Sequence, residues 1–393
     1  MPSVPAFAGD LHSDDSAGTM AIMQFQYRSI CRGPDSILSK LKEAGIANPS
    51  QYIEFFNLRN YDRINANGAM AAAEAESGID YETARKEHDD TLGAGYDGEG
   101  EGTAARDGSE PQSYNAYQSA TTSSNTIDSV AACYMHTGPP LQSIPWTPGN
   151  IEEIDAFVSE ELYIHTKLLI ADDRTIIIGS ANLNDRSQNG DHDSEMAVVI
   201  EDTHMLDSTM NNQPYRVSKF ATQLRRQLFR KHLGMIPLQD PRDLGVNGRP
   251  LSAGPNTYDW DSKADILVAD PLSPTFTQTW NSQATTNTTI FARVFAPVPS
   301  NAIRNWDEYQ SLYSRLFVSE SPPGTDAEEV LPPRYKYGHV VRENFEGGVE
   351  EVKEVLGGVR GTLVDMPLDF LCEVEELAKR GVSYNEITEA IYT

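Results

Sequence analysis

Residues 163–195, which read YIHTKLLIADDRTIIIGSANLNDRSQNGDHDSE, constrain the fold of this chain more than any other stretch. The first part alternates as a β-strand does, the pattern breaks at residues 172–174, and a second apolar run follows at residues 175–178. This pattern predicts a β-hairpin with its turn at the two aspartates. Side chains two apart on a strand point to the same face, so His165 and Lys167 are expected side by side.

The polar residues around this hairpin favour binding of a phosphate. Gly179 permits a tight bend after the second strand, and Ser180 and Asn182 can then turn their polar groups towards one spot. A His beside a Lys suits an anion because both donate hydrogen bonds to oxygen, and it suits a metal poorly. A neutral imidazole can also attack phosphorus or carry a proton. The alternative interpretation is a buried strand with a satisfied core His and a Lys whose ammonium reaches out to solvent.

The spacing resembles the HKD motif of the phospholipase D superfamily: His165-x-Lys167-x4-Asp172-x6-Gly179-Ser180-x-Asn182. Other segments look like the C-terminal half of a eukaryotic phospholipase D of fungal type: residues 26–33, 52–59, 184–187, 193–195, 270–272, 280–281, 360–364 and 392–393. The resemblance covers most of the chain apart from an insert at about residues 65–126.

The resemblance implies an α/β fold, with a mixed β-sheet flanked by helices, that forms one lobe of the bilobal phospholipase D fold. The implied reaction is hydrolysis of phosphatidylcholine to phosphatidic acid and choline through a phosphohistidine, with transfer to other alcohols possible. No cofactor or metal is required by this scheme. The substrate would be a phospholipid at a membrane surface.

The resemblance also implies roles for particular side chains. The implied contacts to the phosphate come from His165, Lys167, Ser180 and Asn182. Glu195 would orient the imidazole and Asp172 would be mainly structural. Glu195 lies at the entrance of an apolar run, where its carboxylate can accept the second imidazole proton; the alternative is an ordinary surface Glu.

One departure from the family pattern matters more than these matches. Members of this kind carry two HKD motifs that meet across a pseudo-twofold axis, whereas among the eight histidines here only His165 has a Lys two residues on. The chain is therefore expected to hold half an active site and to be a fragment or a truncated gene model. Whether His165 is the general acid, which we favour, or the nucleophile stays open. The alternatives are a homodimeric single-motif phosphodiesterase and a catalytically inactive half that binds phosphate or a partner.

Composition narrows the partners and the compartment. The chain has 393 residues and a formal net charge of −27, which argues against general binding to nucleic acid or to anionic membranes. Three widely spaced cysteines indicate a reducing compartment. Neither a signal peptide nor an apolar run long enough to span a bilayer is recognisable, so we expect a cytoplasmic protein, peripheral to membranes.

The expected organisation has four parts: residues 1–64 begin the catalytic lobe, 65–126 form an acidic and disordered insert, 127–235 carry the motif, and 236–393 form a helical and extended region packed on the lobe. Short helices are possible in the insert at residues 70–75 and 81–88. The other helices are expected at residues 36–44, 151–161, 216–233, 273–283, 306–317 and 349–356. A capping box at residues 383–386 predicts a last helical turn or two that ends at residue 393. Strands are expected at residues 52–58 and, as a buried strand, 196–200.

The helix at residues 216–233 has two interpretations. It is the one strongly basic segment, with no acidic residue between residues 216 and 239. Its basic face could bind an anionic membrane surface. The interpretation we favour is a core-facing helix whose charges pair with the acidic body.

Overall fold

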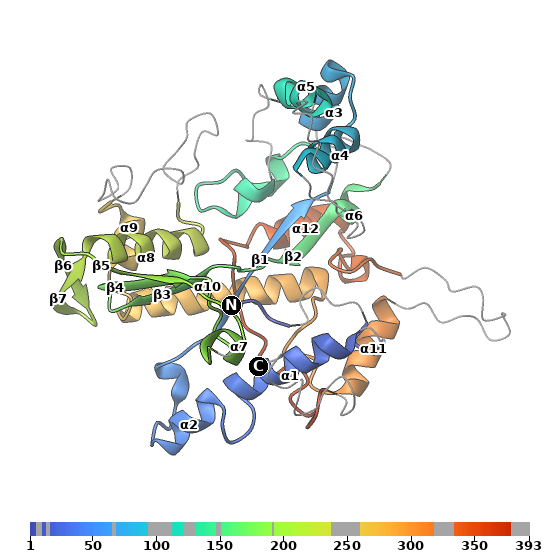
Figure 1. Ribbon diagram of the computed structural model, residues 1–393. Helices are drawn as coiled ribbons and strands as arrows, with labels where there is room; N and C mark the ends of the chain where they lie inside the picture. Colours follow the sequence, from blue (N-terminus) through green and yellow to red (C-terminus); the bar gives the residue numbers. More distant parts are fainter. Residues whose placement is uncertain are drawn as a thin grey trace.

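The fold is mixed α/β, with small antiparallel sheets flanked by helices, as the sequence predicts (Figure 1). This computed structural model describes residues 1–4, 10–12, 16–64, 68–92, 112–121, 130–146, 151–190, 192–236, 260–317 and 334–378. The helical turns expected from residue 383 to residue 393 lie outside these ranges.

The strands form three small sheets. The first has the order β2-β1-β8, with β1 at Phe56–Arg63, β2 at Phe157–Glu161 and β8 at Leu363–Asp365. The second has the order β3-β4-β5, with β3 at Lys167–Ala171, β4 at Thr175–Gly179 and β5 at Ala197–Glu201. The third is a hairpin of β6 at Met205–Met210 and β7 at Gln213–Ser218.

The α-helices of the described residues are α1 Ala17–Ile30, α2 Ile37–Glu43, α3 Gly68–Ser77, α4 Tyr81–Leu92, α5 Gln112–Thr121, α6 Glu153–Ala156, α7 Asp185–Gln188, α8 Lys219–His232, α9 Lys263–Ala269, α10 Pro274–Phe295, α11 Trp306–Leu316 and α12 Gly348–Leu356. Helix α10 begins as predicted, since Ser273 accepts a hydrogen bond from the Phe276 amide and Pro274 occupies the first turn. It continues well beyond the expected end because its apolar face is covered.

The main core lies between this long helix and the first sheet. Phe291 and Phe295 of α10 pack with Tyr61 of β1 and Phe157 of β2, and all four side chains are buried. Helix α12 contributes Leu356 to the same cluster. Burying an aromatic or aliphatic side chain of this size stabilises a fold by about 1.5–3 kcal/mol, so this cluster fixes how the first sheet sits on α10.

Three expectations about local structure are wrong. Residues 151–161 are not one acidic helix: a single turn, α6, leads into strand β2. The first strand lies several residues later than predicted, in β1. The insert contains a helix, α5, that its polar composition did not predict. Tyr117 of α5 is buried against Ala73 and Ala84, so packing stabilises a helix whose own sequence favours it weakly (Figure 1).

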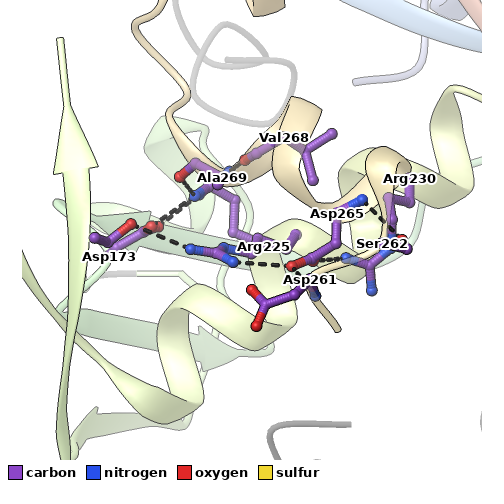
Figure 2. Close-up of polar contacts among 10 residues, drawn as sticks. Asp173, Arg225, Arg230, Asp261, Ser262, Asp265, Val268 and Ala269 are labelled. Carbon is purple, nitrogen blue, oxygen red and sulfur yellow. Dashed lines mark hydrogen bonds and ion pairs between the residues drawn. The ribbon is translucent and has the colours of Figure 1, made fainter. Parts of the chain in front are cut away.

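The basic helix α8 faces the core, which confirms the favoured interpretation. Arg225, Arg226 and Arg230 are all buried, and Arg226 pairs with the carboxylate of Asp265. Figure 2 shows Arg225 beside Asp173 and Arg230 beside Asp265, with which they form ion pairs. Burial lowers the pKa of Arg226, with Asp265 acting in the opposite direction. These three guanidinium groups therefore form ion pairs inside the lobe.

Two glycines allow the chain after α8 to cross the segment before β8. Gly234 and Gly361 both have positive φ, 71° and 61°. A Cβ on Gly361 would lie 2.0 Å from the carbonyl oxygen of His232, to which the Thr362 amide donates a hydrogen bond of 3.0 Å. No other residue fits this crossing without separating the two backbones.

Gly361→Ala is expected to lower the free energy of unfolding by about 2–5 kcal/mol. The left-handed conformation costs an alanine about 1–2 kcal/mol, and breaking a buried backbone hydrogen bond costs about 1–3 kcal/mol more. Gly348→Ala is the matched control, because Gly348 also has positive φ, 65°, but a Cβ there meets nothing within 4 Å. Urea denaturation of both variants measures the difference, and equal losses would contradict a role for the close crossing.

Candidate active site

The predicted hairpin is present and carries the motif. β3 and β4 pair antiparallel, with Lys167 opposite Gly179 and Ala171 opposite Thr175. Asp172 and Asp173 have φ of 54° and 52°, the left-handed backbone of a type I′ turn, and with Arg174 they make a three-residue loop. Aspartate tolerates this conformation better than most residues, so the turn forms where the sequence places it.

At Gly179, beside Lys167, the sheet has no room for a side chain. A Cβ on Gly179 would lie 2.3 Å from the carbonyl oxygen of Met196, because β5 passes close beside it. Lys167, Gly179 and Ala197 are cross-strand neighbours on one face. Lys167 is therefore flanked by small residues, and an anion can approach its side chain from that face.

His165 and Lys167 meet the first requirement of a phosphate site, which is access. His165 is exposed and Lys167 is half-buried. The Lys167 ammonium donates a hydrogen bond of 2.8 Å to the backbone carbonyl of His165, so the cation lies at the residue that carries the imidazole. The rings of His165 and Tyr163 are 5.9 Å apart between centroids. The alternative of a satisfied core histidine does not fit an exposed imidazole.

Ser180, Asn182 and Glu195 surround the same bend. The Ser180 hydroxyl donates to the Glu195 carboxylate, and Ser180 also receives a 3.0 Å hydrogen bond from the Met196 amide. Asn182 is exposed, and its backbone carbonyl accepts from Gln188 at 2.8 Å. In the described part of the chain no hydrogen bond joins Glu195 to His165, so its orienting role stays a prediction.

The two aspartates of the turn differ sharply. Asp172, the motif residue, is exposed, and none of the hydrogen bonds or ion pairs within the described ranges involves its carboxylate. Asp173 is buried, and its two oxygens accept hydrogen bonds of 2.6 and 2.7 Å from Arg225. Sequence reasoning assigned the structural role to Asp172 and missed Asp173 and Arg225. The basic run of α8 was the signal for this pair, because the charges of a helix that faces the core need buried partners of opposite charge.

The strand after the motif corrects another expectation. Residues 196–200 were predicted to form a buried strand, but β5 is exposed along most of its length, with Val198 at 55% and Val199 at 59%. On the face that carries Lys167, Leu169, Ile177 and Val199 lie opposite one another, and all three are exposed. We call these three residues the open apolar row.

No group of three His, Cys, Asp or Glu side chains among the described residues could hold a metal ion. None of the helices in the described ranges has both the length and the apolar character needed to cross a bilayer.

The arrangement can therefore bind and act on a phosphate. The imidazole of His165 can donate or accept a proton, the Lys167 ammonium supplies a fixed positive charge, and Ser180 and Asn182 add polar groups at the same bend. Hydrogen-bond donors of this kind stabilise the charge that develops on phosphoryl oxygens in a transition state.

Comparison with known proteins identifies the family. Residues 147–245 match the family model described as Phospholipase D. Phospholipase D of Phytophthora infestans is 31% identical over 313 residues, which are 79% of this chain and 11% of that protein. Phospholipase D1 of Homo sapiens is 27% identical over 395 residues, 100% of this chain and 24% of that protein. Phospholipase D zeta 1 of Arabidopsis thaliana is 25% identical over 378 residues, 95% of this chain and 23% of that protein.

The chain thus spans about a quarter or less of the length of these relatives. The matched region contains the whole hairpin, the bend at Ser180 and the basic helix α8. By its motif, its fold and these relatives, the chain is a member of the phospholipase D superfamily.

Proposed function

We propose that this chain is the C-terminal catalytic lobe of a phospholipase D that hydrolyses phosphatidylcholine to phosphatidic acid and choline. The observation that carries the proposal is the exposed His165 with the Lys167 ammonium bonded to its carbonyl, in a chain whose relatives are named phospholipase D. The protein would meet its phospholipid substrate as a cytoplasmic protein at a membrane surface.

In the proposed mechanism one histidine attacks phosphorus and a second protonates the departing choline oxygen. Water, or another alcohol, then attacks the phosphohistidine and releases phosphatidic acid or its ester. His165 serves as the general acid and afterwards as the base. Lys167, Ser180 and Asn182 hold the nonbridging oxygens, whose charge grows in the transition state. Glu195 orients His165 and reaches the bend through Ser180.

The second histidine must come from another HKD half. The open apolar row of Leu169, Ile177 and Val199 supports this, because it shares a face with Lys167 and monomeric proteins rarely leave such a strip uncovered. A partner that covers the row would also enclose the Lys167 side of the sheet. We assign the row to the N-terminal HKD half of the same enzyme; a second copy of this chain is the alternative.

Sedimentation of the purified chain combined with a choline-release assay on phosphatidylcholine vesicles tests the proposal. We expect a monomer without turnover alone, and turnover when a separately produced N-terminal HKD half is added. An active dimer of the chain would favour the homodimeric alternative. No turnover in either state would favour a catalytically inactive half that binds phosphate.

Val199→Asp is expected to abolish association with the completing half and, with it, choline release. A carboxylate at the β5 end of the open apolar row would have to be buried under the partner without a counter-charge, which costs several kcal/mol. Val198→Asp is the matched control, because Val198 is equally exposed on the opposite face of the same strand. Sedimentation of each variant with the completing half measures association. Equal loss of association in both variants would show that the substitutions disturb the strand itself and not a contact of the face that carries Lys167.

A further inference from the structure

The hairpin that carries the motif is tied to the rest of the lobe at its turn. The Ser218 amide donates to the carbonyl of Asp173 at 2.8 Å, and the Ser218 hydroxyl donates to the carbonyl of Arg174 at 3.0 Å. Asp202, just after β5 and therefore beside the same end of the sheet, accepts from the Phe220 amide at 3.1 Å. Each of these contacts lies at the end of the hairpin remote from Lys167.

One buried side chain joins this turn to two helices. Arg225 of α8 donates to both oxygens of Asp173, and it also donates to the carbonyls of Val268 at 2.6 Å and Ala269 at 2.9 Å (Figure 2). The side chains of Arg225 and Asp173 are 7% and 2% exposed. A planar guanidinium bound at four oxygens permits one orientation of the turn relative to the end of α9.

On the face of the sheet that carries Lys167, side-chain packing is too sparse to hold the hairpin in place if the turn shifts. Leu169 and Ile177 are exposed there, so side-chain packing on that face does not fix the tilt of the sheet. Asp172 of the turn lies five steps along the chain from Lys167, about 17 Å at 3.4 Å per residue. A rotation of about 4° at the turn would move the phosphate site by about 1 Å, and a displacement of that size can cost about 10²-fold in rate.

We propose that Asp173 and Arg225 are positioning residues for the phosphate site. Their ion pair sets the tilt of the hairpin, and thereby the place of Lys167 and of the bend at Ser180. The inference rests on the proposed function for its effect on turnover, but its structural part concerns the hairpin alone. Asp172, whose carboxylate points to solvent, has no share in this positioning.

The test compares Arg225→Lys with Arg226→Lys. Arg226 is the matched control, because it lies on the same helix, is 6% exposed, and pairs with Asp265 of α9 at 3.0 Å instead of with the hairpin. Lysine keeps the charge and loses the fork in both variants. Two readouts are used: kcat and KM for choline release by the chain assembled with its completing half, and the NMR signals of the His165 ring in the chain alone.

Arg225→Lys is expected to lower kcat per folded molecule at least about tenfold with KM unchanged within about twofold, and to shift the His165 signals. Arg226→Lys should lower the unfolding midpoint while leaving kcat and the His165 signals unchanged. Equal behaviour of the two variants, or unshifted His165 signals in Arg225→Lys, would overturn the proposal. Should Arg225→Lys fail to fold, Asp173→Asn, which keeps the shape of the side chain, takes its place under the same criteria. If the wild-type assembly has no turnover, the proposed function fails, and the NMR readout still decides the positioning role.

Discussion

Replacing His165 by asparagine is expected to lower kcat for choline release by about 10²- to 10⁴-fold in the chain assembled with its completing half. The reason is that an amide keeps a hydrogen-bond donor near the phosphate but cannot carry a proton, and loss of a general acid costs about this much. KM should change little, since Lys167, Ser180 and Asn182 still bind the phosphate. A larger loss than this range would favour the role of nucleophile for His165.

His204→Asn is the control for this experiment. His204 lies between β5 and β6 in the same lobe, its side chain is 83% exposed, and its contact is with Asp202. The variant removes the same ring from a site without proposed chemistry, so choline release should be unchanged. If both histidine variants retained full activity, the assignment of the active site to this hairpin would be wrong.

Asp265→Asn is expected to lower the free energy of unfolding by about 3–5 kcal/mol. The carboxylate is fully buried and pairs with Arg226. It also pairs with the fully buried Arg230 (Figure 2). Removing its charge takes the paired carboxylate from Arg226 and one charged partner from Arg230, and breaking a buried pair in this way costs about 3–5 kcal/mol. Urea denaturation followed by tryptophan fluorescence measures the loss, and Trp260 stacks on Arg226, 4.4 Å from its guanidinium, so it reports on the site directly.

Asp261→Asn makes the same chemical change four residues earlier. The Asp261 side chain is exposed, and its φ of 62° suits asparagine as well as aspartate. Its free energy of unfolding should change by no more than about 0.5 kcal/mol. A small effect of Asp265→Asn, similar to that of the control, would mean that the buried cluster does not hold α8 against α9.

The sequence predicts best where local chemistry decides the structure. The two aspartates at 172 and 173 specify the turn, the apolar runs on either side specify β3 and β4, and Ser273-Pro274 specifies the start of α10. In each case the signal lies within a few residues, so the fold cannot easily override it. The same holds for α11 and α12, which are found where the pattern places them.

Prediction fails where distant contacts decide. Residues 157–161 have acidic helical character, but they form β2 because β1 offers an edge to pair with. Val198 and Val199 belong to an apolar run that is typical of a core strand, yet both are exposed. Their burial depends on whether another element covers them, and the local sequence does not specify that. The pairing of Arg225 with Asp173 crosses 52 residues, and only the fold brings the two together.

The central claim is that His165 and Lys167 together form an anion site, and NMR of the histidine rings in the purified chain tests it most directly. On titration with inorganic phosphate, we expect the ring signals of His165 to shift in a saturable manner while those of His204 stay in place. Lys167→Met should abolish the shift, because the ammonium supplies the fixed charge of the site. Unmoved His165 signals in the wild-type chain, or the same shift in Lys167→Met, would contradict the account.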